Sequence, residues 1–475
     1  MRISKLLPSL FPMLVLAGCR LGPNYARPAI DAPGGFRGQA PELSKTEQTP
    51  GSDKTATPAE SLGDEKWWTV FQDEQLQTLI RTAIANNYDA RIAAERVIAA
   101  QAQLGITHAD QLPSMSASGA WTTVRQERTS ESPVYRAESG QLALNASWEL
   151  DFWGKYKRAT EAARANLAAT EWGRRATIST LVSNVASAYF QLRMYDLELE
   201  ISESTLKSRQ ESLRLTKLLS NGGTETWMDV REAEELVYTA STQIPTYQKQ
   251  IEQQENYISI LLGKNPGPIA RGKKLADQAI LPTVPAGLPS QLIERRPDIR
   301  QAEEKLIAAN AQIGIAKAAY FPSISLTGEA GYQSTALTHL FGGPAGMWSA
   351  GPSVSQPIFE GGRLRNNVRL TESEQREALL VYRQTTQNAF RDVSDALIAY
   401  RKSREAREQQ QLLTAAAQGA AKLSHVRYDG GAASYLEVLT NETNYYNAEL
   451  NLSTARYSEV LALVQIYNAL GGGWQ

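Results

Sequence analysis

The sequence has little cysteine and histidine, and its charges nearly balance. A single cysteine among 475 residues excludes a disulfide framework and a thiolate metal cage. The three histidines, His108, His339 and His425, lie far apart without ligand spacing, so no metal site is expected. A formal net charge of −1 gives no basic field for nucleic acid. A Gly-rich phosphate loop, a nucleophile elbow and paired His ligands are all missing, which argues against an enzyme.

Long apolar runs are missing as well. Beyond the N-terminal region, no stretch offers the roughly 18 consecutive apolar residues of a membrane-spanning helix. Any membrane crossing by this chain is therefore expected to use strands closed into a β-barrel. The hydrophobic content of 42% still indicates a folded protein rather than a disordered one.

The N-terminus has the features of an export signal. Arg2 and Lys5 precede an apolar run over residues 6–17 that is too short to span a bilayer as a helix. The run ends in Leu16-Ala17-Gly18-Cys19, and small residues before a cysteine resemble a bacterial lipoprotein signal. The resemblance implies removal of residues 1–18 and a covalent lipid on Cys19, with no other cofactor. In bacterial lipoproteins, an Asp directly after the lipidated cysteine tends to retain the protein in the inner membrane. This chain has Arg20 at that position, so the resemblance points to the outer membrane. The alternative is an ordinary signal peptide that contains a cysteine.

The two halves of the chain match at a nearly constant offset, which indicates a tandem duplication. Residues 63–263 are expected to form the first copy and residues 290–475 the second. A Pro-rich linker or equatorial segment, 264–289, joins them, and an extended lipid-anchored arm, 19–62, precedes them. Pairs 209 residues apart are Asp89 and Asp298, Gly105 and Gly314, and Pro113 and Pro322; pairs 208 apart are Gly154 and Gly362, Gly223 and Gly431, and Asp229 and Glu437.

Within each copy, the hydrophobic periodicity predicts a helix, two strands and two long helices. The strands alternate small or apolar residues with polar ones, and their length of about 9–11 residues suits a tilted membrane strand. The alternative is a small soluble antiparallel sheet. The first of the two long helices in each copy runs for about 66 residues, roughly 100 Å, and needs lateral support from neighbouring helices. The expected ranges are 74–111 and 290–319 for the first helices, 113–150 and 322–358 for the β-hairpins, and 154–263 and 362–471 for the helical hairpins.

Several motifs add to these features: Trp67-Trp68 with Phe71, Glu294-Arg295-Arg296-Pro297-Asp298-Ile299-Arg300, Ala318-Ala319-Tyr320-Phe321-Pro322-Ser323, Gly361-Gly362-Arg363 and the two Gly-Gly turns of the helical hairpins. Together they resemble the TolC-type outer-membrane efflux proteins, in the lipoprotein branch that serves resistance–nodulation–division pumps. The resemblance covers nearly the whole chain. It implies a mostly α fold with a membrane β-barrel, in which a homotrimer closes a 12-stranded barrel that continues as a long periplasmic α-helical barrel.

The function that the resemblance implies is a passive exit duct and not an enzyme. The duct would export drugs or other small molecules across the outer membrane, with a periplasmic adaptor protein and an inner-membrane transporter as partners. Two alternatives stay open. One is an outer-membrane duct for type I protein secretion, and the other is a lipid-anchored periplasmic coiled-coil tether without a channel.

The resemblance also places a gate at the turns of the helical hairpins. The gate tyrosine falls on Tyr428 and the acidic constriction positions fall on Glu437 and Thr440, while the family's arginine falls on Ala433. Asp229 is the equivalent acid of the first copy. Asp229 and Glu437 from three protomers would form an acidic ring that favours cations, or they would simply stabilise helix N-termini; both roles can hold at once. The adaptor is expected to contact the two exposed turns, at Gly222, Gly223, Gly430 and Gly431. The alternative is that these are turns without a partner.

Overall fold

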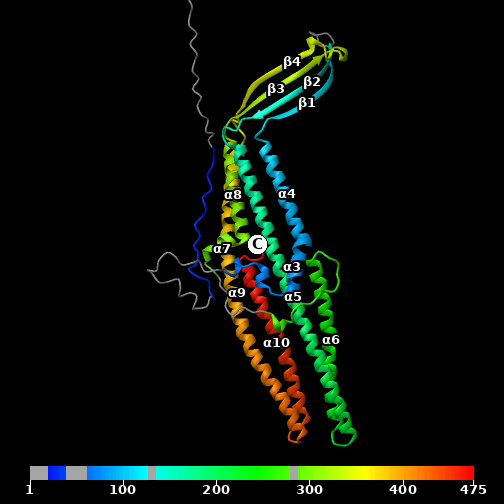
Figure 1. The fold of residues 1–475 in the computed structure, drawn as a ribbon. Coiled ribbons are helices and arrows are strands. Elements are labelled where there is room, and N and C mark those ends of the chain that lie inside the picture. The colour runs from blue at the N-terminus through cyan, green and yellow to red at the C-terminus, as the bar shows by residue number, and fades with distance from the viewer. Residues whose placement is uncertain (1–19, 39–60, 127–134, 279–286, 288, 475) are drawn as a thin grey trace, which may run out of the picture. The chain divides into compact units, whose positions relative to one another are not determined.

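The computed structural model describes residues 20–38, 61–126, 135–278, 287 and 289–474 (Figure 1). The expected signal peptide, residues 1–18, and the expected lipidation site, Cys19, lie outside these residues. The chain divides into two compact units. Unit 1 contains residues 1–28, 98–169 and 302–381, and unit 2 contains residues 29–97, 170–301 and 382–475. Each unit therefore draws on both sequence copies.

The long elements of the two copies have matching lengths, which confirms the predicted duplicated unit. Helices α4 (Tyr88–Ala109) and α8 (Pro297–Ala318) have 22 residues each. Helices α5 (Lys155–Asn221) and α9 (Arg363–Asp429) have 67 residues each. The return helices α6 (Trp227–Leu261) and α10 (Tyr435–Ala469) have 35 residues each. Bounds of α5, α6, α9 and α10 agree with the expected helical hairpins.

The expectation of one continuous first helix in each copy was wrong. In the first copy, a single residue lies between the end of α3 (Glu74–Asn86) and the start of α4 at Tyr88. Asn87 separates them, because its side-chain oxygen accepts a hydrogen bond from the Ala90 amide (3.1 Å) while its side-chain amide donates to the Leu261 carbonyl (3.0 Å). In the second copy, α7 (Pro289–Arg295) ends just before Pro297 begins α8, since proline suits a first helical position and restricts the residue before it.

Unit 1 holds one antiparallel sheet in the order β1-β2-β3-β4 (Figure 1). Its strands are β1 (Ser114–Gln126), β2 (Tyr135–Glu149), β3 (Ser323–Ser334) and β4 (Gly346–Ser355). Short 3-10 helices η3 (Leu337–His339) and η4 (Gly343–Ala345) lie between β3 and β4. Within the described chain, β1 and β4 each pair with a single strand, so each presents one open edge.

The strand register separates apolar from polar side chains. Leu142 pairs with Tyr332, Leu144 with Ala330 and Ala330 with Trp348, and because side chains alternate across a strand these residues share one face. The opposite face is polar and forms hydrogen bonds between strands, from Gln141 to Glu329, from Asn145 to Ser118 and from Gln333 to Ser139. The apolar face comprises Met115, Ala117, Gly119 and Trp121 of β1, Leu142, Leu144, Ala146 and Trp148 of β2, Ile324, Leu326, Gly328, Ala330 and Tyr332 of β3, and Trp348, Ala350, Pro352 and Val354 of β4.

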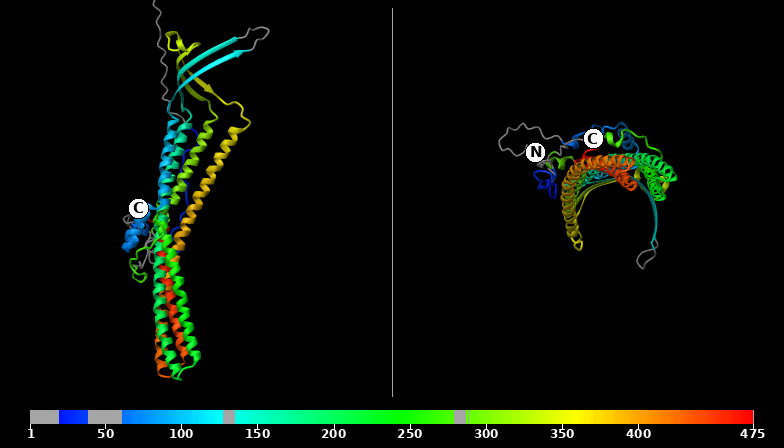
Figure 2. Two further views of the ribbon diagram at one scale, coloured as in Figure 1. Left: turned by 90° about the vertical axis from the view of Figure 1, so that its right-hand side faces the viewer. Right: turned by 90° about the horizontal axis from the view of Figure 1, so that it is seen from below.

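Unit 2 contains most of the two helical hairpins, with both of their tips, and the segments that bind them together. Figure 2 shows its long helices running alongside one another. Trp67 of α2 (Trp67–Val70) and Phe71 are buried, whereas Trp68 is partly exposed. None of the helices in the described ranges combines the length and the apolar character needed to cross a membrane.

Asp73 joins three parts of unit 2. Its Oδ1 accepts the amides of Gln75 and Leu76 at the start of α3, while its Oδ2 accepts the Tyr189 hydroxyl (2.9 Å) and the Lys273 amide (2.9 Å). Burial alone would raise the pKa of Asp73, but its hydrogen bonds outweigh burial and lower the pKa. Residues 264–278 of the expected linker, which include η2 (Leu275–Asp277), are thereby fixed to α3 and α5 through a single carboxylate.

Candidate functional site at the hairpin tips

The two helical hairpins turn in the same way at their tips. Gly223 and Gly431 have φ of +81° and +69°, a conformation that glycine adopts without a Cβ clash. Around Gly431, the Gly431 amide donates to the Tyr428 carbonyl (2.9 Å) and the Ala432 amide to the Arg427 carbonyl (2.8 Å). The equivalent bonds run from Gly223 to Ser220 and from Thr224 to Leu219. This pattern closes a helix C-terminus and reverses the chain within a few residues.

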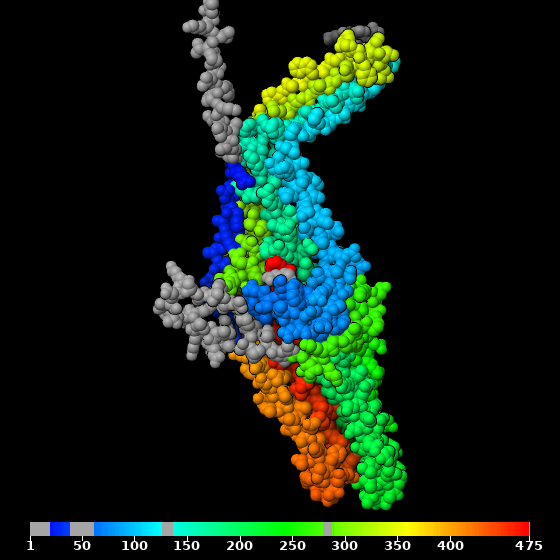
Figure 3. Space-filling view, viewed as in Figure 1, coloured from blue at the N-terminus to red at the C-terminus, as the bar shows by residue number. Residues whose placement is uncertain are grey.

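The two tips lie next to each other in unit 2 (Figures 1 and 3), and all four predicted tip glycines are exposed. A small core supports them just inside the turns. It consists of Ala233, Tyr435, Val438 and Leu439, with Leu213, Leu236 and Tyr428 packed against it. Residues of both hairpins therefore share one apolar cluster, so the tips are held together by packing as well as by polar contacts.

Asp229 caps the first turn of α6. The Thr226 hydroxyl accepts a hydrogen bond from the Asp229 amide (3.3 Å), and the Asp229 carboxylate accepts one from the Thr226 amide (2.8 Å). These reciprocal bonds form a capping box. The hydrogen bonds from Thr226 hold the pKa of Asp229 below its usual value. The structure confirms the helix-start interpretation of Asp229, while its role in a constriction stays a prediction.

Glu437 pairs with an arginine that the sequence analysis did not identify. The Arg427 guanidinium donates to Glu437 Oε1 (2.6 Å) and to the Ala432 carbonyl (3.0 Å). Arg427 lies in the last turn of α9, on the other side of the turn from Glu437. The absence of an arginine at Ala433 therefore does not leave Glu437 without a basic partner. The signal in the sequence was a basic residue ten positions before an acid, across a Gly-Gly turn.

Tyr428 joins the two hairpins. Its hydroxyl donates a hydrogen bond to the carboxylate of Glu225, which precedes α6, and its ring lies 5.4 Å from the ring of Tyr435. Burial and the Glu225 carboxylate raise the pKa of Tyr428, so it stays neutral and remains a donor. Glu225 was not among the predicted site residues, because nothing in the sequence shows which acid of the first tip faces Tyr428.

Thr440 lies outside this set of contacts. It is exposed, and its hydroxyl donates to the Leu436 carbonyl of its own helix (2.8 Å). The structure thus brings together Tyr428 with Glu225 and Arg427 with Glu437, places Asp229 beside them at the start of α6, and leaves Thr440 on the surface of α10.

A charged cavity of about 420 Å³ lies behind the tips, between α5, α9 and α10. His425 Nε2 and Glu442 Oε1 are 2.7 Å apart on its wall. Arg209, with only 2% of its surface exposed, donates to the Leu236 carbonyl and lies over the Tyr446 ring. Burial lowers the pKa of Arg209, although the charge of Glu442 opposes this effect. The two hairpins therefore also meet through buried charge.

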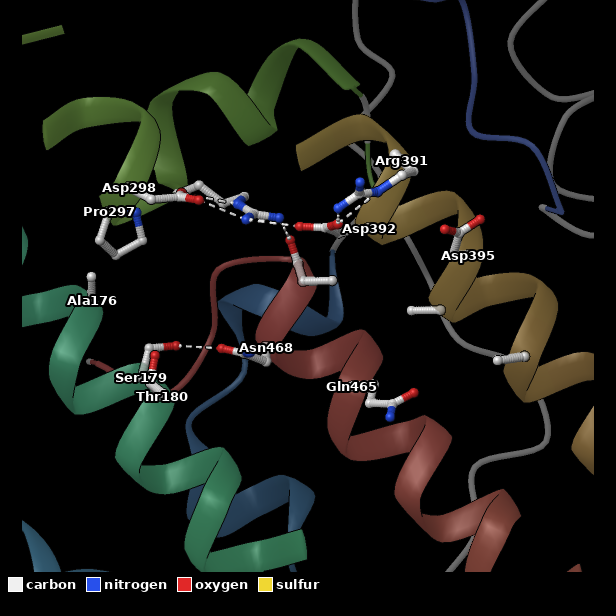
Figure 4. A pocket seen from close by; sticks show the side chains of 14 residues that line it. Ala176, Ser179, Thr180, Pro297, Asp298, Arg391, Asp392, Asp395, Gln465 and Asn468 are labelled. Carbon is white, nitrogen blue, oxygen red and sulfur yellow. Dashed lines mark hydrogen bonds and ion pairs between the residues drawn. The ribbon is translucent and has the colours of Figure 1, made fainter. Parts of the chain in front are cut away.

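The Arg296-Pro297-Asp298 part of the family motif builds a different pocket, about 650 Å³ in volume, at the other end of α10 (Figure 4). Arg296 donates to Asp298 (2.6 Å), Asp392 of α9 (3.3 Å) and the Ala469 carbonyl (3.2 Å). Burial alone would lower the pKa of Arg296, but the two carboxylates outweigh it and raise the pKa. This arrangement fixes three helices and does not resemble a catalytic or metal centre. Across the described residues, no group of three or more His, Cys, Asp or Glu side chains is arranged to hold a metal ion.

Comparisons with known proteins agree with this architecture. The profile of the family described as "Outer membrane efflux protein" matches residues 79–264 and 288–472. The cation efflux system protein CusC of Escherichia coli O6:H1 is 35% identical over 463 residues, which is 97% of each chain. The probable efflux pump outer membrane protein TtgC of Pseudomonas putida is 36% identical over 466 residues, 97% of this chain and 94% of its own.

Solved structures show the same fold. A crystal structure of CusC, described in connection with transmembrane channel formation, superposes with a TM-score of 0.85 at 33% identity and covers 96% of this chain and 100% of its own. The open state of the MtrE outer membrane channel of Neisseria gonorrhoeae has a TM-score of 0.85 at 30% identity, covering 96% and 99%. This chain belongs to the outer membrane efflux protein family, whose members are efflux ducts rather than enzymes.

Proposed function

We propose that this protein is the exit duct of a tripartite efflux pump, which passes drugs or other small molecules from a periplasmic tube to the outside of the cell. The observation that carries the proposal is the two-faced sheet of unit 1 in the same chain as the long helical hairpins of unit 2. An apolar face suits lipid and a polar face suits an aqueous lumen. CusC and TtgC, an efflux system protein and an efflux pump protein, support small-molecule export as the class of activity.

The open sheet edges support a homotrimer. An unpaired strand edge exposes backbone donors and acceptors, which are costly in a membrane. Pairing of β4 in one copy with β1 in the next would satisfy both edges. Three copies of this four-stranded sheet would close the expected twelve strands around a lumen lined by the polar face.

The arm after Cys19 contacts the junction between β2 and α5, which would place a lipid on Cys19 near the sheet. The Leu21 amide donates to the Trp153 carbonyl (3.3 Å), at the junction between β2 and α5. The buried Arg158 donates to the Leu21 carbonyl (3.0 Å), the Gly22 carbonyl (3.2 Å) and Asn24 Oδ1 (2.9 Å). An acyl chain on Cys19, two residues before Leu21, would therefore lie near the helix end of the strands. The mass of the N-terminal peptide tests this: residues 1–18 still attached, or an unmodified Cys19, would contradict it.

The contacts at the tips would hold the periplasmic end shut. Opening by separation of the two hairpins has to break the hydrogen bond between Tyr428 and Glu225, and any straightening of the second turn has to break the Arg427–Glu437 ion pair. In a trimer, Asp229 and Glu437 would add negative charge at the mouth and favour cations. Thr440, one turn further along α10, would contribute a neutral hydroxyl to the same wall.

The adaptor protein would bind the tips, and the inner-membrane transporter would supply the driving energy. Exposed apolar side chains stand at equivalent positions of both hairpins, Leu218 with Val426 and Met228 with Leu436, beside the exposed glycines. Large exposed apolar side chains that repeat in two copies indicate two equivalent contact surfaces per protomer. An adaptor with helical ends fits such surfaces.

Single-channel conductance in a planar bilayer tests the duct and its gate together. Tyr428→Phe combined with Arg427→Ala removes both polar contacts but keeps the packing of the ring at 428, so the conductance should rise several-fold over the parent. Asp229→Ala with Glu437→Ala should reduce cation preference. Arg214→Ala, which breaks an exposed pair with Glu211 on α5, is the matched control and should change neither property. No current from folded trimers would exclude the duct; a current that both tip variants leave unchanged would place the gate elsewhere.

A further inference from the structure

The segment between β3 and β4 has an unusual composition. Between Glu329 and Glu360 there is no Asp, Glu, Lys or Arg. Residues 335–345 connect the two strands at the sheet end opposite the junctions with α8 and α9 (Figure 1). The other hairpin differs, since charged residues stand close to its connection, with Arg136 paired to Glu138 at 2.9 Å. A connection that is merely exposed to water has no need to exclude charge.

Large apolar side chains of this segment are exposed and continue the apolar face of the sheet. Leu337 and Phe341 are 67% and 71% exposed, and Trp348 at the start of β4 is 81% exposed. The Phe341 ring lies 5.7 Å from the ring of Tyr332, which belongs to the apolar face. Leu340 is buried and fixes the segment from within. The exposed apolar surface of the sheet therefore continues onto the connecting segment through the contact between Tyr332 and Phe341.

We propose that residues 335–345 are seated in the outer leaflet of the membrane as an anchor, with lipid hydrocarbon as their partner. The inference rests on the proposed function, because it needs the apolar face of the sheet to contact lipid. Aromatic and aliphatic side chains without neighbouring charge partition into the membrane interface. Transmembrane β-strand proteins carry girdles of aromatic residues at this level of the bilayer. The contact with Tyr332 places the Phe341 side of the segment on the apolar face of the sheet, while His339 and Pro344 line a pocket with Ser139 and Gln333 of the polar face.

Lipid seating gives the duct a fixed depth at its outer end. The segment belongs to the second copy only, so a trimer would carry three such anchors, each containing the two short 3-10 helices between β3 and β4. With the acyl chain near the opposite end of the strands, both ends of the sheet would be held at defined levels in the bilayer.

Spin labels at single cysteines test the inference. We would label Phe341→Cys, Trp348→Cys on the apolar face and Ser349→Cys on the polar face, in trimers reconstituted into phospholipid vesicles. Collisions with oxygen, which concentrates in lipid, are compared with collisions with a water-soluble nickel chelate. The unlabelled parent is the background control, since an acylated Cys19 has no free thiol. Position 341 should resemble position 348, with a several-fold higher ratio of oxygen to nickel collisions than position 349.

The outcomes separate the inference from the proposed function. If position 348 contacts lipid while position 341 collides mainly with nickel, the segment is in water and the inference is wrong, although the membrane duct stands. If position 341 is shielded from both reagents, the segment packs against other copies across the mouth, and the inference is again wrong. If positions 348 and 349 are equally accessible to nickel, the sheet does not face lipid and the proposed function itself fails.

Discussion

Glu198 should make the stability of the helical unit depend on pH. It lies on α5, has 6% of its surface exposed and accepts a hydrogen bond only weakly from the Thr454 hydroxyl of α10, at 3.4 Å. Burial raises the pKa of Glu198 to about 7, from an ordinary value of 4.5. The folded protein therefore binds this proton more tightly than the unfolded chain does.

The sign and size of the effect follow from that difference. The stabilisation is complete below pH 4.5, the unfolded value, and is lost as the pH rises through about 7. A difference of about 2.5 pKa units corresponds to an upper value of about 3 kcal/mol. Glu198→Gln keeps the carbonyl oxygen facing Thr454 but does not ionise. The variant should therefore be more stable than the parent at pH 8 and lose this advantage near pH 5.

Thermal unfolding of the purified protein in detergent, followed by circular dichroism between pH 5 and pH 8, measures this difference. The melting temperature of Glu198→Gln relative to the parent should rise by a few degrees over that range. Glu200→Gln is the matched control, because Glu200 is exposed and pairs with Lys274 at the surface. Parallel pH profiles for Glu198→Gln and the parent would refute the reasoning.

Further substitutions test three particular elements. Asp73→Asn replaces Oδ2, which accepts hydrogen bonds from Tyr189, Lys273 and Gln278, with an amide group that cannot accept them. The free energy of unfolding, measured with denaturant, should fall by about 2–4 kcal/mol. The parent should lose the same stabilisation in acid, as the pH falls through the depressed pKa of Asp73. Gly22→Ala, at φ +88° with a Cβ only 2.6 Å from another backbone atom, should release the arm to protease, whereas Gly34→Ala, with open space around it, should not. Gly431→Ala should destabilise the second tip by about 1 kcal/mol, because alanine is strained at the positive φ of this position. Gly419→Ala should stabilise α9 by about 1 kcal/mol, because alanine is a better helix former than glycine. Equal effects of the two substitutions on the melting temperature would contradict both assignments.

The sequence by itself determined the order of the elements and their duplication. The constant offset between the copies predicted helices of equal length, and α5 and α9 have 67 residues each. Alternation in the strands predicted one polar face, because successive side chains of a strand point to opposite sides. The Gly-Gly turns were also predictable, since a positive φ at Gly223 and Gly431 is a local requirement of the chain reversal.

Contacts between distant segments were decided only by the tertiary structure. Tyr428 reaches Glu225 rather than Asp229, although the two acids lie four residues apart, because the packing of Tyr435 and Leu439 sets the rotation of one hairpin against the other. Arg427 pairs with Glu437 from the opposite side of the turn, whereas the position that matches the family's arginine is Ala433. The break at Asn87 depends on the Leu261 carbonyl, 174 residues away. Periodicity describes which side of a helix is apolar, but it does not say which neighbour that side will meet.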